Sequence, residues 1–203
     1  MKKLLLTAVM ALVAFCAQAQ VTWNVKAGGG FSFITGTADG GGNKGKMVAK
    51  AGIGAEIPLA GNFMLMPSVE YAMKGMKWES DDHNVLYKWE LHYAQLPVFA
   101  AYRINLGGVA NMTAKLGPYF AYAFSGREKY EWEGLEPVEN NLFDAPNTNR
   151  FDVGGIVGLD LEYHHFVIGA EYERGFVSIF KDTGGKSINN SSFYVTIGYK
   201  FSL

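Results

Sequence analysis

Residues 192–203 read SFYVTIGYKFSL, and apolar or aromatic side chains alternate along this stretch with polar or small ones. Successive side chains on a β-strand point to opposite faces of the sheet. The stretch is therefore predicted to form a strand with one wholly apolar face. The apolar set shares one parity and comprises Phe193, Val195, Ile197, Tyr199, Phe201 and Leu203.

The same two-residue period recurs through the chain and predicts an all-β fold. Further strands are expected at 22–33, 46–59, 63–74, 85–103, 114–124, 151–163 and 166–173. An even number of antiparallel strands, here eight, is the arrangement of bacterial outer-membrane barrels. We expect one up-and-down transmembrane barrel and no second domain.

The parity of the segment 85–103 changes near Tyr93 and Ala94, which predicts a β-bulge in this strand. Two sets of side chains are then expected to face lipid on either side of the bulge. The first set is Tyr87, Trp89, Leu91 and Tyr93, and the second is Leu96, Val98, Ala100 and Tyr102.

The connections alternate between short and long. Short turns are predicted at 59–62, 105–110 and 164–165, and long polar loops at 35–45, 75–84, 125–149 and 181–191. In outer-membrane barrels the short turns are periplasmic and the long loops extracellular. The even strand count places both termini on the periplasmic side.

The first 19 residues are predicted to be a signal peptide that is cleaved, which leaves a barrel domain at 20–203. Lys2 and Lys3 precede an apolar run, and Ala17-Gln18-Ala19 is a small-x-small cleavage site. An uncleaved anchor and a lipoprotein acylated at Cys16 are the alternatives. Cleavage removes Cys16, the only cysteine, so no disulfide is expected.

The composition is that of a two-sided sheet. The chain has 25 Gly, 14 Phe, 11 Tyr and 4 Trp, yet its mean hydropathy is only +0.02. Strands that show one face to lipid and the other to a polar lumen explain this combination. The formal net charge of −1 gives no basic surface for a nucleic acid.

The inward parity is rich in glycine and in charges of both signs, as the narrow interior of a small barrel requires. The expected lumen charges are Lys26, Lys50, Glu56, Glu70, Lys115, Asp152, Asp160, Glu162, Glu171 and Lys200. Aromatic residues gather toward the strand ends, as interfacial girdles do. These are Trp23, Phe33, Phe63, Tyr71, Trp89, Tyr102, Phe151, Tyr163, Tyr199 and Phe201.

With the strands assigned, the chain resembles the Bacteroidota porin-family outer-membrane β-barrels, PorT-like in the broad sense. The motifs are the AQAQ cleavage site, Gln95-Leu96-Pro97-Val98 before Ala101-Tyr102-Arg103, Gly117-Pro118-Tyr119-Phe120, Phe151-Asp152-Val153-Gly154 and Ile197-Gly198-Tyr199-Lys200-Phe201. The resemblance covers the mature chain and implies no catalytic residues. One departure is Leu203, since such barrels commonly end on an aromatic residue that the assembly machinery recognises.

Histidines are the candidates for chemistry, but no catalytic, cofactor or metal residue is assigned. His83 follows Asp81 and Asp82 near Ser80, and His92 is expected to face the lumen. His164 and His165 lie at a periplasmic turn, where neighbouring side chains point apart. The glycine runs 28–30 and 40–42 are not phosphate loops, because no helix follows them. Glycine in a strand permits close backbone approach instead.

The loop 125–149 combines acidic and aromatic residues and is the candidate binding surface, although a merely solvated loop is the alternative. Its acids are Glu128, Glu131, Glu133, Glu136, Glu139 and Asp144, and its aromatic residues include Tyr130, Trp132 and Phe143. Such a loop can bind a partner, a glycan or divalent cations that bridge lipopolysaccharide.

The preferred hypothesis is a non-enzymatic outer-membrane barrel with a structural or surface-binding role. The alternatives are a narrow channel for small polar solutes or ions, and a lipid-modifying enzyme that uses His83 or His92. The expected partners are outer-membrane lipids, lipopolysaccharide, the barrel-assembly machinery and an extracellular ligand of unknown identity, with no cofactor and no nucleic acid.

Overall fold

The computed structural model describes residues 21–36, 43–80, 85–132, 136–144, 147–181 and 187–202. The predicted signal peptide, the glycine run 40–42, His83 with Asp81 and Asp82, Glu133 and Leu203 lie outside these residues. Within them, no helix is long and apolar enough to cross a membrane.

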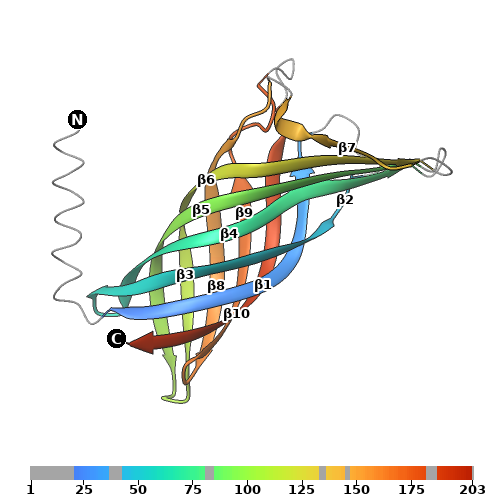
Figure 1. The fold of residues 1–203 in the computed structure, drawn as a ribbon. Coiled ribbons are helices and arrows are strands. Elements are labelled where there is room, and N and C mark those ends of the chain that lie inside the picture. The colour runs from blue at the N-terminus through green and yellow to red at the C-terminus, as the bar shows by residue number, and fades with distance from the viewer. Residues whose placement is uncertain are drawn as a thin grey trace, which may run out of the picture.

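The described residues form one antiparallel sheet that closes on itself (Figure 1). The long strands are β1 (Thr22–Thr35), β3 (Lys46–Ala60), β4 (Phe63–Ser80), β5 (Val85–Leu106), β6 (Ala110–Trp132), β8 (Phe151–Tyr163), β9 (Phe166–Gly175) and β10 (Asn189–Ser202). They pair in the order β4-β3-β1-β10-β9-β8-β6-β5, and β5 pairs with β4 to complete the ring. The predicted eight-stranded barrel is confirmed.

Three shorter elements lie on the extracellular side. They are β2 (Asn43–Lys44), β7 (Val138–Asn141) and the 3-10 turn η1 (Leu142–Asp144). β2 pairs with β4, and β7 pairs with β6. In Figure 1, β4, β5 and β6 run far beyond the other strands. We call this part, residues 76–80, 85–90 and 126–132 with β7, the extension.

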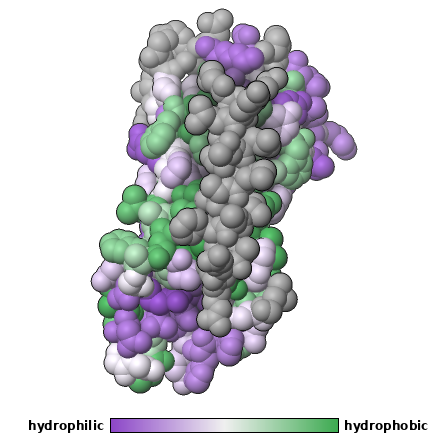
Figure 2. All heavy atoms as spheres, turned by 90° about the vertical axis from the view of Figure 1, so that its left-hand side faces the viewer, coloured by the Kyte–Doolittle hydropathy of each residue, from purple (hydrophilic) through white to green (hydrophobic). Residues whose placement is uncertain are grey.

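The predicted alternation sets the two faces of the barrel. Along β10, Val195 is 47% exposed and Ile197 66%, whereas Tyr194 and Thr196 between them are buried. Figure 2 shows apolar side chains gathered around the middle of one face of the molecule and hydrophilic ones toward its two ends. Outer-membrane barrels carry such an outward apolar band, which is typically about 25 Å tall.

One predicted orientation is wrong. Trp89, Leu91 and Tyr93 are buried inside the barrel, Tyr87 packs against the same buried cluster, and none of the four faces lipid. The parity of β5 does not slip, because the register shift falls in its partner: His92 pairs with Ser125, and Tyr93 pairs with Ala123. The bulge is therefore taken up by β6 at Phe124, opposite the position where the sequence predicted it.

Three predicted loops are shorter than expected. β4 continues to Ser80, β6 continues to Trp132, and β10 already begins at Asn189. Their polar sequences read as loops, yet cross-strand pairs of charges and aromatic rings stabilise strands that stand in water. Lys88 and Glu131 are one such pair, with Nζ and Oε1 3.2 Å apart.

The inward glycines of β1 allow close contact between strands, as the sequence predicted for run 28–30. A Cβ atom on Gly30 would lie 1.8 Å from the carbonyl oxygen of Phe193, and one on Gly28 would lie 2.0 Å from that of Val195. In the β1–β10 ladder, Gly28 pairs with Thr196 and Gly30 pairs with Tyr194. Any side chain there would push the two strands apart.

Candidate functional site

The middle of the lumen is filled by a network of buried ion pairs. Lys50 Nζ lies 2.7 Å from Glu171 and 3.1 Å from Glu70, and it also contacts Glu173. Lys26 bridges Glu70 and Glu171 at 2.7 and 2.8 Å. The Lys50 and Glu171 side chains have no exposed surface. Charges of opposite sign thus neutralise each other in the space where a channel would need water.

The network continues across the barrel on both sides of Lys50. Lys115 pairs with Asp160 at 2.7 Å and with Glu171 at 2.8 Å. Lys74 lies 3.2 Å from Glu173 and sits 4.0 Å from the centre of the Tyr119 ring. All of these side chains are buried. The strands β1, β3, β4, β6, β8 and β9 each contribute at least one charge, so the network ties opposite walls of the barrel together.

A carboxylate trio in this network has the spacing of a cation site. Glu70, Glu171 and Glu173 can each place an oxygen within 4.8 Å of the others. The Lys50 ammonium contacts all three. A cation is therefore already supplied by the chain itself.

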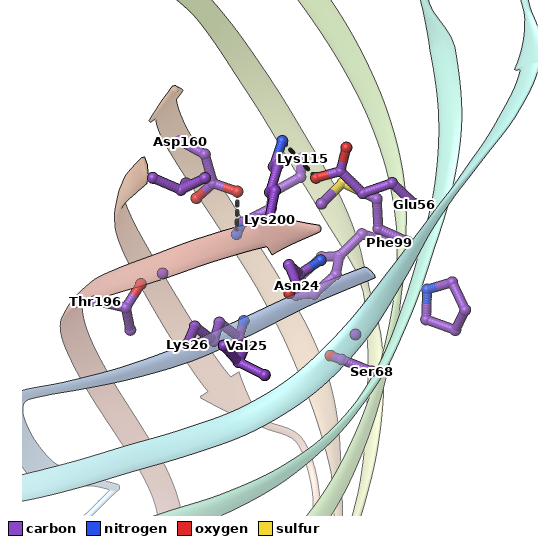
Figure 3. A pocket seen from close by; sticks show the side chains of 15 residues that line it. Asn24, Val25, Lys26, Glu56, Ser68, Phe99, Lys115, Asp160, Thr196 and Lys200 are labelled. Atoms are coloured by element: carbon purple, nitrogen blue, oxygen red, sulfur yellow. Dashed lines mark hydrogen bonds and ion pairs between the residues drawn. The ribbon is translucent and has the colours of Figure 1, made fainter. Parts of the chain in front are cut away.

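One small cavity lies in the periplasmic half of the lumen. Figure 3 shows Lys115, Asp160, Lys200 and Glu56 reaching into it. The cavity there has a volume of about 30 Å³. That is room for about one or two water molecules.

A second charge cluster lies at the periplasmic mouth. Lys200 contacts both Glu56 and Glu162 at 2.6 Å, and Arg103 pairs with the same two carboxylates. An open cavity of about 180 Å³ at this mouth is also lined by His164 and His165. The histidine rings pack outward, against Tyr163 and Tyr199 respectively. The predicted placement of these histidines at a turn is confirmed, and they do not converge.

The extracellular end of the lumen is closed by apolar side chains. We call residues 142–144, 147–150, 176–181 and 187–188 the cap. Its members hydrogen-bond one another, from Asn149 N to Ile179 O and from Ile179 N to Ile188 O, at 2.7 and 2.8 Å. Leu142 and Ile179 are buried in one cluster with Ile34, Trp89 and Leu91. The Phe180 ring meets the Trp89 ring edge-on at 5.1 Å.

His92 faces outward, so its predicted lumen position is wrong. Its ring stacks on Tyr71 at 5.9 Å and lies 6.2 Å from Phe124. Nδ1 is 2.6 Å from the Tyr71 hydroxyl, and Nε2 is 3.1 Å from Glu90. The reason is the unbroken parity of β5, which places every even-numbered side chain from 92 to 102 on the outer face. Among the described residues, no serine or cysteine hydrogen-bonds His92.

One face of the extension carries an aromatic ladder around a carboxylate. The Tyr87 and Tyr130 rings lie 4.5 Å apart, and Trp132 stacks on Tyr130 at 5.8 Å with an interplanar angle of 10°. Glu128 accepts hydrogen bonds from the Tyr87 and Tyr130 hydroxyls and from the Trp89 indole. Trp132 remains 39% exposed. Four residues of the predicted loop, Glu128, Tyr130, Glu131 and Trp132, therefore lie in strand β6.

The pKa values of three ionisable groups in the extension are shifted by neighbouring side chains. Hydrogen bonds from Lys88 and Lys129 hold the pKa of the exposed Glu131 below its usual value, and Lys44 does the same for the pKa of Glu79. Burial, together with the nearby Glu128 carboxylate, raises the pKa of Tyr87. Each of these groups keeps its ordinary charge at neutral pH.

All ten predicted lumen charges line the interior or its periplasmic mouth, and three further polar residues lie there as well. Lys74, Glu173 and Gln95 are also buried there, and Gln95 Nε2 donates to Glu173 at 3.0 Å. The alternation places Lys74 and Glu173 on the inward parity, so the sequence could have identified them. Gln95 could not be found that way, because the expected bulge obscured the parity of its strand.

Comparisons with known proteins give one family. A family model described as an outer membrane protein beta-barrel domain matches residues 9–181. No curated protein matches the chain. Among solved structures, Ail of Yersinia pestis in complex with the heparin analogue sucrose octasulfate is 15% identical, with a TM-score of 0.45 over 90% of this chain and 99% of that chain.

Two further solved structures are similar at the same level. Neisserial surface protein A is 12% identical, with a TM-score of 0.49 over 88% of this chain and 97% of that chain. The outer membrane enzyme PagL is 11% identical, with a TM-score of 0.46 over 87% of this chain and 98% of that chain.

Proposed function

The chain belongs to the outer membrane protein β-barrel domain family, and we propose that it is a non-conducting, non-enzymatic barrel whose role is carried out at its extracellular face. The observation that carries this proposal is the double closure of the lumen. A buried ion network fills its middle, and the apolar cap covers its extracellular end. A closed barrel of this kind serves as a membrane anchor for the extracellular extension.

The part that stands above it is the extension. Its strands are ordered well beyond the apolar band, and its aromatic ladder presents Tyr130 and Trp132 together with a carboxylate. Aromatic faces beside hydrogen-bonding groups suit recognition of an amphipathic surface ligand. We take a saccharide of the surrounding cell surface as the first ligand class to test.

The partners in this proposal follow from the location. The protein is an outer-membrane protein, so lipids surround its outer face. Within the proposal, the outer leaflet supplies lipopolysaccharide and the barrel-assembly machinery inserts the chain. We also infer from motifs such as Gly117-Pro118-Tyr119-Phe120 and Ile197-Gly198-Tyr199-Lys200-Phe201 that the chain is a PorT-like barrel of Bacteroidota.

The channel alternative is less well supported. The lumen cavity of about 30 Å³ is lined by Lys26 and Lys115 of the ion network, and Lys50 is not among its lining residues. The enzyme alternative lacks a convergent group around His92, and His83 lies outside the described residues.

Liposome swelling tests closure, and a glycan array tests surface binding. Proteoliposomes diluted into arabinose should swell no faster than empty ones. On the array, the wild-type protein in lipid nanodiscs should bind at least one saccharide. Tyr130→Ala should abolish this binding, and Tyr199→Ala at the periplasmic end should leave it unchanged. Rapid swelling would contradict the closed barrel. Saccharide binding that survives Tyr130→Ala would contradict a role for the ladder.

A further inference from the structure

A pocket opens in the barrel wall where β6 changes partners. The β6–β8 ladder ends at the pair Tyr122 and Phe151, and the β6–β7 ladder begins at the pair Arg127 and Asn141. Residues 124–126 of β6 therefore pair with neither β7 nor β8 on this side. A pocket of about 350 Å³ lies at this gap.

The pocket is lined by polar groups and by two arginines. Asn140 and Asn141 of β7 and Ser125 of β6 contribute polar side chains. Arg127 and Arg150 line it from opposite ends of the gap in the ladder. Two guanidinium groups beside amide and hydroxyl groups form the kind of donor set that binds a phosphate oxygen cluster.

Neither arginine is neutralised by a carboxylate in the part of the chain that the structure describes. Arg127 is exposed and forms no ion pair there. Arg150 donates to the Ala123 carbonyl at 3.4 Å, and its guanidinium lies 4.1 Å from the centre of the Phe143 ring. The Phe143 contact holds Arg150 in place without removing its charge.

The nearby carboxylates already have other cations. Glu139 also lines the pocket, and its Oε1 lies 3.6 Å from Lys129. Glu90 stands next to Arg127 across the β5–β6 ladder, but it contacts Lys46 at 2.7 Å and His92 at 3.1 Å. The pocket therefore keeps a net positive charge.

The position of the pocket indicates which anion would fill it. Phe124, which lines the pocket, is 54% exposed on the outer face, and its ring lies 6.3 Å from that of Tyr71. Exposed aromatic residues at the edge of the apolar band mark the interface with the headgroups. Arg127 follows Phe124 along β6 in the extracellular direction, and Arg150 hydrogen-bonds Ala123 at the level of Phe124. Both guanidinium groups are therefore placed beside the headgroup interface that Phe124 marks.

We propose that Arg127 and Arg150 form a binding site for a headgroup phosphate of lipopolysaccharide in the outer leaflet. This inference rests on the part of the proposed function that places lipopolysaccharide around the barrel. It adds a defined site on one side of the barrel, between β6, β7 and η1. The lipid would occupy the gap in the ladder with a phosphate oxygen facing both guanidinium groups.

The test is a titration of the full protein, folded in detergent, with purified deep-rough lipopolysaccharide, followed by native mass spectrometry. Arg127→Gln is the main variant, because this exposed side chain supports no packing. Lys77→Gln, on the β4 strand of the extension, is the matched control. Loss of one charge-assisted contact should weaken binding about tenfold. Arg150→Gln should weaken binding to a similar extent, and its folding is confirmed by heat-modifiable gel mobility.

Two further probes separate the possible results. Dephosphorylated lipopolysaccharide should bind the wild type more weakly than the phosphorylated form binds Arg127→Gln, because it loses the contacts to both arginines. Inorganic phosphate should compete only at high concentration. Equal binding of phosphorylated lipid to wild type and Arg127→Gln would overturn the site and leave the lipopolysaccharide contact standing. No binding by the wild type would overturn both. Phosphate that binds as tightly as the lipid would overturn the lipid as the source.

Discussion

The ammonium of Lys50 lies 2.7 Å from Glu171 Oε2 in the centre of the barrel, and neither side chain has any exposed surface. Lys50 comes from β3 and Glu171 from β9, on different walls of the ring. Their contact joins those walls through the lumen. The same pair that stabilises the barrel therefore also blocks it, and the proposed closed barrel depends on this contact.

Removing the Lys50 charge should destabilise the barrel strongly. Lys50→Met leaves Glu70, Glu171 and Glu173 close together without their shared cation. Breaking a buried ion pair on one side costs about 3–5 kcal/mol, and we expect a loss of this size in the free energy of unfolding. Urea unfolding in detergent micelles, followed by tryptophan fluorescence, measures it.

The control for this variant is Lys77→Met. Lys77 forms an exposed pair with Glu79 at 3.5 Å, and exposed pairs contribute about 0–1 kcal/mol. If both variants lower the free energy of unfolding by a similar small amount, the lumen network does not hold the walls of the barrel together.

Adding one methyl group to the inward face of β1 should separate β1 from β10. Gly30→Ala would bring a Cβ atom to 1.8 Å from the Phe193 carbonyl oxygen, so the backbone must move. Overpacking of this kind costs about 1–3 kcal/mol. The matched control is Gly29→Ala on the outer face, where the nearest atom would be 3.4 Å away. Unfolding midpoints in urea should fall for the first variant only; an equal fall for both would contradict the close approach.

Acid should loosen the extension before it affects the barrel. The pKa of Glu131 is lowered from 4.5 by Lys88 and Lys129, so its pairs stabilise the strand above pH 4.5. That contribution is lost as the pH falls through the lowered pKa of the folded state. Amide hydrogen exchange, corrected for intrinsic rates, should show reduced protection at residues 127–132 below that pH and unchanged protection in β10. Equal amide protection of residues 127–132 at neutral and acid pH would contradict a role for the Glu131 pairs in stabilising the extension.

The protein should leave lipopolysaccharide chemically unchanged. His92 is hydrogen-bonded to Tyr71 and Glu90, and among the described residues no serine or cysteine nucleophile joins them. Mass spectrometry of lipopolysaccharide incubated with folded protein should therefore show no loss of acyl chains. Loss of a chain that His92→Ala abolishes would establish the enzymatic alternative instead.

The alternation of side chains predicted most of the fold because it is a direct consequence of barrel geometry. Ile197 and Thr196 face opposite sides as expected, and the ten predicted lumen charges lie on the inner side. Parity identifies a face but does not tell which strand of a pair absorbs an extra residue. The sequence therefore predicts the bulge in β5, whereas it lies in β6, and the predicted faces of Trp89, Leu91 and His92 are wrong.

The candidate site was harder to predict, since it depends on contacts between distant segments. Phe180 reaches Trp89 only because segments 147–150 and 176–181 fold over the lumen. Likewise, Arg127 and Arg150 are 23 positions apart and line one pocket at the gap between two ladders. Neither arrangement leaves a periodic signal, and an acidic, aromatic sequence such as 128–132 reads as a loop until its cross-strand partners are known.

Planar-bilayer conductance tests the closed lumen most directly. The refolded wild-type protein should be silent. Trp89→Ala weakens the cap and removes one hydrogen bond to Glu128, yet it should also be silent because the Lys50 network still fills the centre. Folding is confirmed beforehand by heat-modifiable gel mobility. Discrete conductance steps in the wild type that change size with Glu70→Ala or Lys115→Ala would contradict the closed barrel and establish a channel through the same charges.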